Sequence, residues 1–186
     1  MGIHDVTGES DGDFVRRVLD GDTAAYAGLV TRYRDRLGCY AMRMLGNQAD
    51  AEEALQDTFV RGYRSLRRCT DPERFGAWLF GILVNRCRTL GGRRARRQRT
   101  VVHDEVALSR ASVGDKGEEF ALRETIQWAV AQLSTPNREA FLLKHVEELS
   151  YDEMTELTGV SVPALKMRVM RAREELQRLL SEVVRD

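Results

Sequence analysis

The spacing of apolar residues predicts helices along most of this 186-residue chain. Apolar positions recur every three or four residues, the period at which side chains share one face of an α-helix. A first helix is expected from about Asp13 to Asp20, and a longer one from the capping residue Asp22 to Gly46. A third helix starts at the capping residue Asn47. The residues expected to face inward from this third helix are Ala51, Leu55, Phe59, Gly62, Tyr63 and Leu66.

A fourth helix is predicted to begin at Asp71 and Pro72, a capping residue followed by the residue best suited to the first helical position. We expect the pair Gly91-Gly92 to interrupt it. These four helices make a first domain over residues 10–97. Residues 98–118 lack apolar periodicity and mix Ser, Gly, Asp and Lys, so they are expected to form a flexible linker.

The second predicted domain covers residues 119–186 and begins with two further helices. The pair Thr135-Pro136 separates them, because a proline favours a new helix start. The first of the two helices has an apolar stripe of Leu122, Ile126, Ala129, Val130 and Leu133. The fold class that follows is all-α, with two small helical domains joined by a linker.

Residues 150–180 have the features of a helix-turn-helix. Ser150 can cap a short helix, with Glu153 completing a capping box, and Gly159 can end it in a left-handed conformation. Ser161 can then cap a longer helix. Its apolar stripe is Leu165, Val169, Ala172, Leu176, Leu179 and Val183. Such a unit places its second helix in the DNA major groove, but an ordinary helical hairpin with a solvated basic face has the same pattern.

The charge of the chain is balanced overall but unevenly distributed. Lys and Arg number 29, and so do Asp and Glu, which gives a formal net charge of zero. One basic block carries no acid: Arg86, Arg88, Arg93, Arg94, Arg96, Arg97 and Arg99. A neutral total with one basic block is compatible with nucleic-acid binding at that place. The block is also compatible with a solvated helix end, where cations favour the helix dipole.

Signals for catalysis, metal binding and membrane insertion are lacking in the sequence. Cys39, Cys69 and Cys87 are odd in number and far apart, so neither a disulfide framework nor a zinc site is expected. Phosphate-binding loops and sequence-local catalytic motifs are absent. No apolar run approaches the 18 residues of a membrane span. We therefore expect a cytoplasmic protein without a cofactor, a metal or an enzymatic activity.

Three stretches resemble bacterial sigma factors. Residues Asp50 to Tyr63 resemble their second conserved region, and Arg74 to Arg86 the promoter-melting region that follows. Residues Leu133 to Leu180 resemble their C-terminal helix-turn-helix domain. With two domains and a short linker, the chain is similar to the extracytoplasmic-function (ECF) group. The resemblance implies a subunit that binds core RNA polymerase and directs it to the −10 and −35 elements of promoter DNA, with an anti-sigma factor as a possible further partner.

The resemblance also implies roles for individual residues. Glu53, Gln56 and Asp57 would contact the clamp helices of core polymerase. Asn85, Arg86 and Arg88, with the loop residues Arg67 and Arg68, would engage the −10 element. Arg93 and Arg94 are added to this −10 group as predicted phosphate contacts, because they belong to the basic block. The residues that would bind the −35 element are Lys166, Arg168, Met170, Arg171 and Arg173.

The start of the recognition helix departs from the family pattern Ser-x-Gly-Thr-Val-Lys-Ser-Arg. Here it is Ser161-Val-Pro-Ala-Leu-Lys-Met-Arg168, so the hydroxyl groups expected at Ala164 and Met167 are absent, and Pro163 replaces glycine. Two possible DNA contacts are lost with them. A stand-alone helix-turn-helix regulator that acts without core polymerase is the alternative function, and an RNA-binding adaptor is a third.

Overall fold

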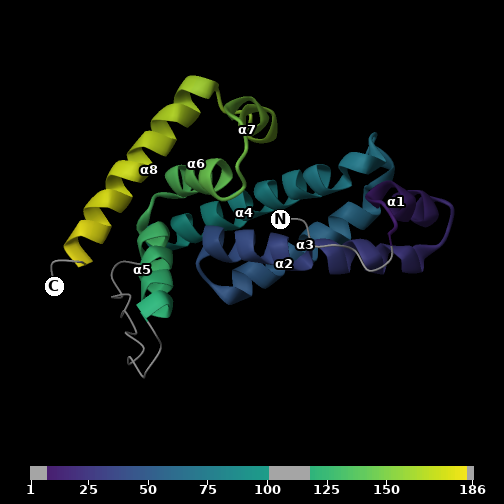
Figure 1. Ribbon diagram of the computed structural model, residues 1–186, viewed down its shortest axis with the longest axis horizontal. Coiled ribbons are helices and arrows are strands. Elements are labelled where there is room, and N and C mark those ends of the chain that lie inside the picture. Colours follow the sequence, from purple (N-terminus) through teal and green to yellow (C-terminus); the bar gives the residue numbers. More distant parts are fainter. Residues whose placement is uncertain (1–7, 101–117, 184–186) are drawn as a thin grey trace. The chain divides into compact units, whose positions relative to one another are not determined.

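In the computed structural model, the described residues are 8–100 and 118–183, and the side chains of 94–100, 118–121 and 123 lie outside the description. All regular structure within these two ranges is helical, which confirms the all-α prediction (Figure 1). The chain divides into two compact units, Met1–Arg88 and Thr89–Asp186. Residues 101–117, most of the predicted linker, lie outside the described ranges, and the predicted domain boundaries stay predictions.

The first unit begins with α1 (Asp11–Leu19), which starts two residues before its predicted position. Ser10 is the cap: its hydroxyl accepts a hydrogen bond from Asp13 N, and the Asp13 carboxylate accepts one from Ser10 N. Asp13 is therefore the third residue of a capping box rather than the start of the helix. The Asp13 carboxyl has its pKa lowered to about 2 by hydrogen bonds, first from Arg16 and then from Ser10.

Two further helices follow in the first unit, α2 (Tyr26–Leu45) and α3 (Gln48–Arg64). A 3-10 turn (Thr23–Ala25) precedes α2, so the predicted start at Asp22 is wrong; the Asp22 carboxylate pairs with Arg17 at 2.6 Å. Gly46 ends α2 with φ +72°, and Asn47 caps α3 by accepting a hydrogen bond from Asp50 N at 2.8 Å. Both of these signals are confirmed.

Two 3-10 turns, Leu66–Arg68 and Pro72–Arg74, connect α3 to α4 (Phe75–Thr100). The predicted interruption at Gly91-Gly92 is wrong, because α4 continues through both glycines. A glycine in a helix interior costs about 1 kcal/mol relative to alanine. Proline would remove a helix hydrogen bond, because it has no backbone N–H. Glycine keeps its backbone N–H, so it weakens the helix but leaves the hydrogen bond in place.

Buried apolar residues of α1, α2, α3 and α4 form the core of the first unit, in which α2 and α3 lie side by side (Figure 1). Gly62 lets α3 pack closely, because a Cβ there would lie 2.7 Å from Leu79 Cδ1 and 2.9 Å from Tyr26 Oη. Tyr63, predicted to face inward, is 41% exposed, and its ring packs edge-on against that of Tyr26. Thr58 is buried although polar, because its hydroxyl donates to the carbonyl of the preceding turn at 2.7 Å.

The second unit contains α5 (Glu118–Gln132), α6 (Thr135–His145), α7 (Tyr151–Thr158) and α8 (Val162–Val183).

The start of α5 differs from the prediction. Leu122 and Ile126 are 58% and 44% exposed, and burial begins only at Ala129. Apolar periodicity identifies one face of a helix, but burial also requires a packing partner, and in the described residues α5 has one only along its last turns.

The helix-turn-helix has the predicted local structure. Ser150 accepts a hydrogen bond from Glu153 N at 3.2 Å, and the Glu153 carboxylate accepts one from Ser150 N at 2.8 Å, which confirms the capping box. Gly159 ends α7 with φ +69°. The apolar stripe of α8 is buried from Leu165 to Leu179, but its predicted last member, Val183, is 42% exposed near the end of the helix.

Candidate functional site

The residues predicted to bind polymerase lie together on α3. Glu53 is 54% exposed and Asp57, one helical turn later, is 29% exposed, while Gln56 lies next to Asp57 and is exposed. The spacing of three and four residues places all three side chains on one face of the helix. The structure therefore brings this predicted group together at the surface of the first unit.

Arg86 of α4 contacts two members of this group. Its Nη2 donates a hydrogen bond to Glu53 Oε1 at 2.7 Å. Its Nε lies 2.7 Å from Asp57 Oδ2 in an ion pair that is not a hydrogen bond. Arg61, from the same helix as the acids, donates its Nε–H to Asp57 Oδ2 at 2.9 Å. We call Glu53, Asp57, Arg61 and Arg86 the ion-pair cluster; its two carboxylates and two guanidinium groups have formal charges that cancel.

The four members of the ion-pair cluster differ in exposure. The Arg86 side chain is only 13% exposed, whereas that of Arg61 is 59% exposed. Arg86 was predicted to belong to the −10 residues. Its contact with Glu53 joins residues 33 positions apart, so no local pattern in the sequence could indicate it. In the structure Arg86 is directed toward α3.

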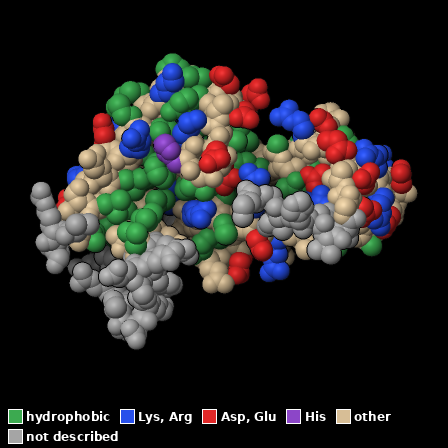
Figure 2. All heavy atoms as spheres, in the orientation of Figure 1, with side chains coloured by type: hydrophobic (Ala, Val, Ile, Leu, Met, Phe, Trp, Pro, Cys, Tyr) green, Lys and Arg blue, Asp and Glu red, His purple; other side chains and the backbone are tan. Residues whose placement is uncertain are grey.

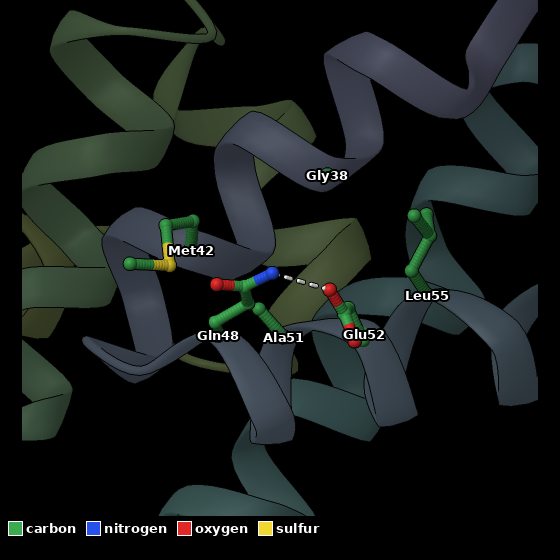
Figure 3. Close-up of a pocket in the computed structure, with 6 residues that line it drawn as sticks. All are labelled: Gly38, Met42, Gln48, Ala51, Glu52 and Leu55. Carbon is green, nitrogen blue, oxygen red and sulfur yellow. Dashed lines mark hydrogen bonds between the residues drawn. The ribbon is translucent and has the colours of Figure 1, made fainter.

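A shallow apolar groove of about 290 Å³ lies between α2 and α3, beside the same helix (Figure 3). Gly38 and Met42 line it from α2. Gln48, Ala51, Glu52 and Leu55 line it from α3. Gln48 donates a hydrogen bond to Glu52 at 2.7 Å along its edge. The groove thus borders the helix that carries Glu53 and Asp57, with an apolar floor and a polar edge.

The predicted −10 residues come from two elements. Arg67 and Arg68 are exposed in the 3-10 turn after α3, and Asn85, Arg88 and Arg93 lie on α4. Of these, Asn85 and Arg93 are exposed and Arg88 is half-buried. Arg94 also belongs to α4, with its side chain outside the described set. Because α4 is unbroken at its glycine pair, Asn85 through Arg94 lie on one continuous helix.

The predicted −35 residues lie along α8, with Lys166, Met170 and Arg171 directed away from its buried stripe and Arg168 and Arg173 on either side of it. Lys166, Met170, Arg171 and Arg173 are exposed, and Arg168 is half-buried. Lys166 Nζ lies 5.6 Å from the centre of the Tyr151 ring, which is within range of a cation–π contact between α8 and α7. The assignment of these residues to the −35 element stays a prediction.

His145, which sequence reasoning missed, lies close to this basic surface. It ends α6, and its ring packs against Phe141 at 4.9 Å between ring centres. Partial burial lowers the pKa of His145, and the positive charges of Arg173 and Lys144 lower it further. The sequence offered no signal, because only the packing of α6 on α8 brings His145 near Arg173.

Neither a metal site nor a membrane span occurs in the described part of the chain. Over residues 8–100 and 118–183, His, Cys, Asp and Glu side chains form no group that could hold a metal ion. Within the same ranges, none of the helices combines the length and the apolar character that crossing a bilayer requires.

Comparison with known proteins identifies both units. Residues 29–100 match the family model for Sigma-70 region 2, and residues 123–176 match that for Sigma-70, region 4. RNA polymerase sigma factor CarQ of Myxococcus xanthus is 34% identical, over 91% of this chain and 97% of the relative. The ECF RNA polymerase sigma factor SigW of Bacillus subtilis is 28% identical, over 91% of this chain and 96% of the relative.

Two solved structures are similar along most of the chain. The sigma factor RpoE from Bartonella quintana, in complex with the anti-sigma factor NepR, has a TM-score of 0.65 and 26% identity, over 84% of this chain and 96% of that one. CnrH, in complex with the cytosolic domain of CnrY, has a TM-score of 0.62 and 28% identity, over 94% of this chain and 99% of that one. Both sigma regions occur in the expected order, and the chain belongs to the ECF group of RNA polymerase sigma factors.

Proposed function

We propose that this sigma factor binds core polymerase through the acidic face of α3, formed by Glu53, Gln56 and Asp57. The observation that carries the proposal is the exposure of these side chains on one helix face within the matched region 2. Carboxylates on an exposed face favour a partner with basic side chains. The neighbouring groove, with its apolar floor, would add contact area beside them.

Promoter DNA is proposed to bind at two places. The −10 element would contact Arg67 and Arg68 in their turn, and Asn85, Arg88, Arg93 and Arg94 on α4. The −35 element would contact the outer face of α8 through Lys166, Arg168, Met170, Arg171 and Arg173. Arginine and lysine at these positions can bind phosphates at any sequence and guanine in the major groove.

Regulation and location complete the proposal. RpoE was solved in complex with an anti-sigma factor, and we propose a protein of that class as the regulator of this chain. Because the chain acts on polymerase and promoter DNA, we place it in the cytoplasm, without catalysis of its own. Isolation of the chain from its source cells should recover a protein that inhibits its transcription activity; a fully active chain recovered alone would contradict this part.

Run-off transcription with purified core polymerase tests the main function. The parent chain should support promoter-dependent transcripts that core enzyme alone does not make. The variant Asp57→Arg should bind core polymerase at least tenfold more weakly, because it reverses a charge on the proposed interface, where a like-charge contact costs several kcal/mol. The control Asp20→Arg makes the same charge change at an exposed residue after α1 and should bind as the parent does.

The assignment of α3 would be wrong if Asp57→Arg and the parent bound core polymerase equally. The alternative, a stand-alone regulator, predicts specific protection of the promoter by the chain without core enzyme. Footprinting of the chain alone, beside the reconstituted holoenzyme, separates these two functions.

A further inference from the structure

Arg86 occupies an unusual position between the two proposed binding surfaces. It comes from α4, the helix proposed to bind the −10 element, but its guanidinium group contacts Glu53 and Asp57 on α3. The two carboxylates lie one helical turn apart, and Arg86 spans them with two nitrogens at 2.7 Å each. A guanidinium group can do so because its donors lie in a rigid plane and point in several directions.

The geometry assigns these nitrogens to the acidic face rather than to DNA. With its side chain 13% exposed, Arg86 would have to leave both carboxylates before its Nε and Nη2 could reach a phosphate. Such a move would leave the Asp57 carboxylate, whose side chain is 29% exposed, paired with the exposed Arg61 alone among the residues that the structure describes. Partly buried ion pairs are costly to break from one side, because the remaining charge is left poorly compensated.

The same geometry leaves the acidic face accessible to a partner. Glu53 remains 54% exposed while one of its oxygens is held by Arg86. Each carboxylate therefore keeps acceptor capacity for a basic group from outside, since an ionised carboxylate has about four lone-pair sites. Holding flexible side chains in place before binding reduces the entropy that association would otherwise lose.

We propose that Arg86 is a positioning residue of the polymerase-binding surface: it spans Glu53 and Asp57 and orients both carboxylates for basic groups of core polymerase. This inference rests on the proposed function of α3. It assigns Arg86 a role different from its sequence neighbours Asn85 and Arg88, which keep their proposed contacts with the −10 element.

The charge-conserving variant Arg86→Lys tests the positioning role. Lysine keeps the positive charge but has a single ammonium group, which cannot span two carboxylates in the same way. Core polymerase binding should weaken about fivefold to tenfold, chiefly through faster dissociation, and tenfold corresponds to about 1.4 kcal/mol. The matched control Arg61→Lys changes the exposed arginine on Asp57 and should alter the affinity by less than about twofold.

A double-mutant cycle separates positioning from a purely structural role. In a Glu53→Gln, Asp57→Asn background the carboxylates are gone, so Arg86→Lys should have no further effect on core binding. A loss of affinity of equal size in both backgrounds would show that Arg86 acts only through folding, and would overturn the proposal. Parent-like core binding by Arg86→Lys, with the thermal unfolding midpoint unchanged, would also overturn it.

A second variant tests whether Arg86 binds DNA. Holoenzyme containing Arg86→Gln, assembled at saturating core enzyme, should show the parent's salt dependence of promoter binding. A phosphate contact made by Arg86 would instead lower the slope of log affinity against log salt by about 0.9, and that result would overturn the assignment. If Asp57→Arg weakens core binding and Arg86→Lys does not, the positioning role fails while the proposed function stands; if neither weakens it, both fail.

Discussion

Replacing Gly159 with alanine should destabilise the second unit alone. Gly159 ends α7 with φ +69° and donates its N–H to Thr155 O at 2.8 Å. A Cβ at this position would meet no atom within 4 Å, so the penalty is conformational and not steric. A left-handed conformation costs an L-residue about 1–2 kcal/mol. Alanine also lowers the conformational entropy of the unfolded chain, which offsets about 0.4–1 kcal/mol of this cost. The expected net loss is about 1 kcal/mol.

The two tryptophans of the chain allow this loss to be measured in one unit at a time. Trp78 lies in the first unit and Trp128 in the second. In a Trp78→Phe background, Trp128 fluorescence should report urea unfolding of the second unit. The free energy of unfolding of a small unit falls by about 1–2 kcal/mol per molar urea. A loss of about 1 kcal/mol in Gly159→Ala should therefore lower the urea concentration at the unfolding midpoint by about 0.5–1 M.

Two controls test the reasoning behind this value. Asparagine tolerates positive φ better than alanine does, so Gly159→Asn should lose less stability. Gly46 has nearly the same conformation at the end of α2, with φ +72° and equally open space. Gly46→Ala should therefore shift the transition of Trp78, measured in a Trp128→Phe background, and leave that of Trp128 unchanged. Equal losses for alanine and asparagine, or no shift with either, would refute the conformational explanation.

Two further predictions concern the DNA-binding unit. If Arg171 reads a guanine in the −35 element, Arg171→Ala should cost about 1–3 kcal/mol on the preferred promoter and relax specificity at one position; an equal loss across a panel of single-base −35 variants would contradict base reading. The pKa of His145 is lowered in the folded chain, so below its ordinary value of about 6.5 the unfolded chain binds more protons. Unfolding free energy measured through Trp128 should therefore fall as the pH drops from about 7.5 to 5.5, less steeply in His145→Gln, and parallel pH profiles would contradict this role.

Signals that depend on a few adjacent residues could be predicted from the sequence. The capping box at Ser150, the left-handed glycines Gly46 and Gly159 and the cap at Asn47 all appear where they were predicted. Each depends on backbone groups within a single turn, so the residue type nearly determines the geometry. For the same reason the exposed face of α8 could be predicted from its apolar stripe.

Features that depend on packing between elements could not be predicted. Gly91-Gly92 has the composition of a helix end, yet α4 continues through it, because two weak helix formers do not outweigh the turns on either side. Leu122 has the spacing of a core residue but remains exposed. Arg86 belongs to a basic block in sequence, but the packing of α4 on α3 makes it the partner of two acids.

The zero net charge of the chain is compatible with DNA binding because many of its charges cancel in local pairs. On α1, Asp13 pairs with Arg16 at 2.8 Å, and Arg17 pairs at 2.8 Å with Glu9, which precedes the helix. Figure 2 shows acidic and basic side chains intermixed around α1 in the first unit. Seen from beyond a Debye length, about 10 Å in 0.1 M salt, such pairs contribute almost no field. A promoter phosphate near α8 is therefore attracted by the cations of that helix face. The net charge of the whole chain has little effect on it, since charges elsewhere are screened or already compensated.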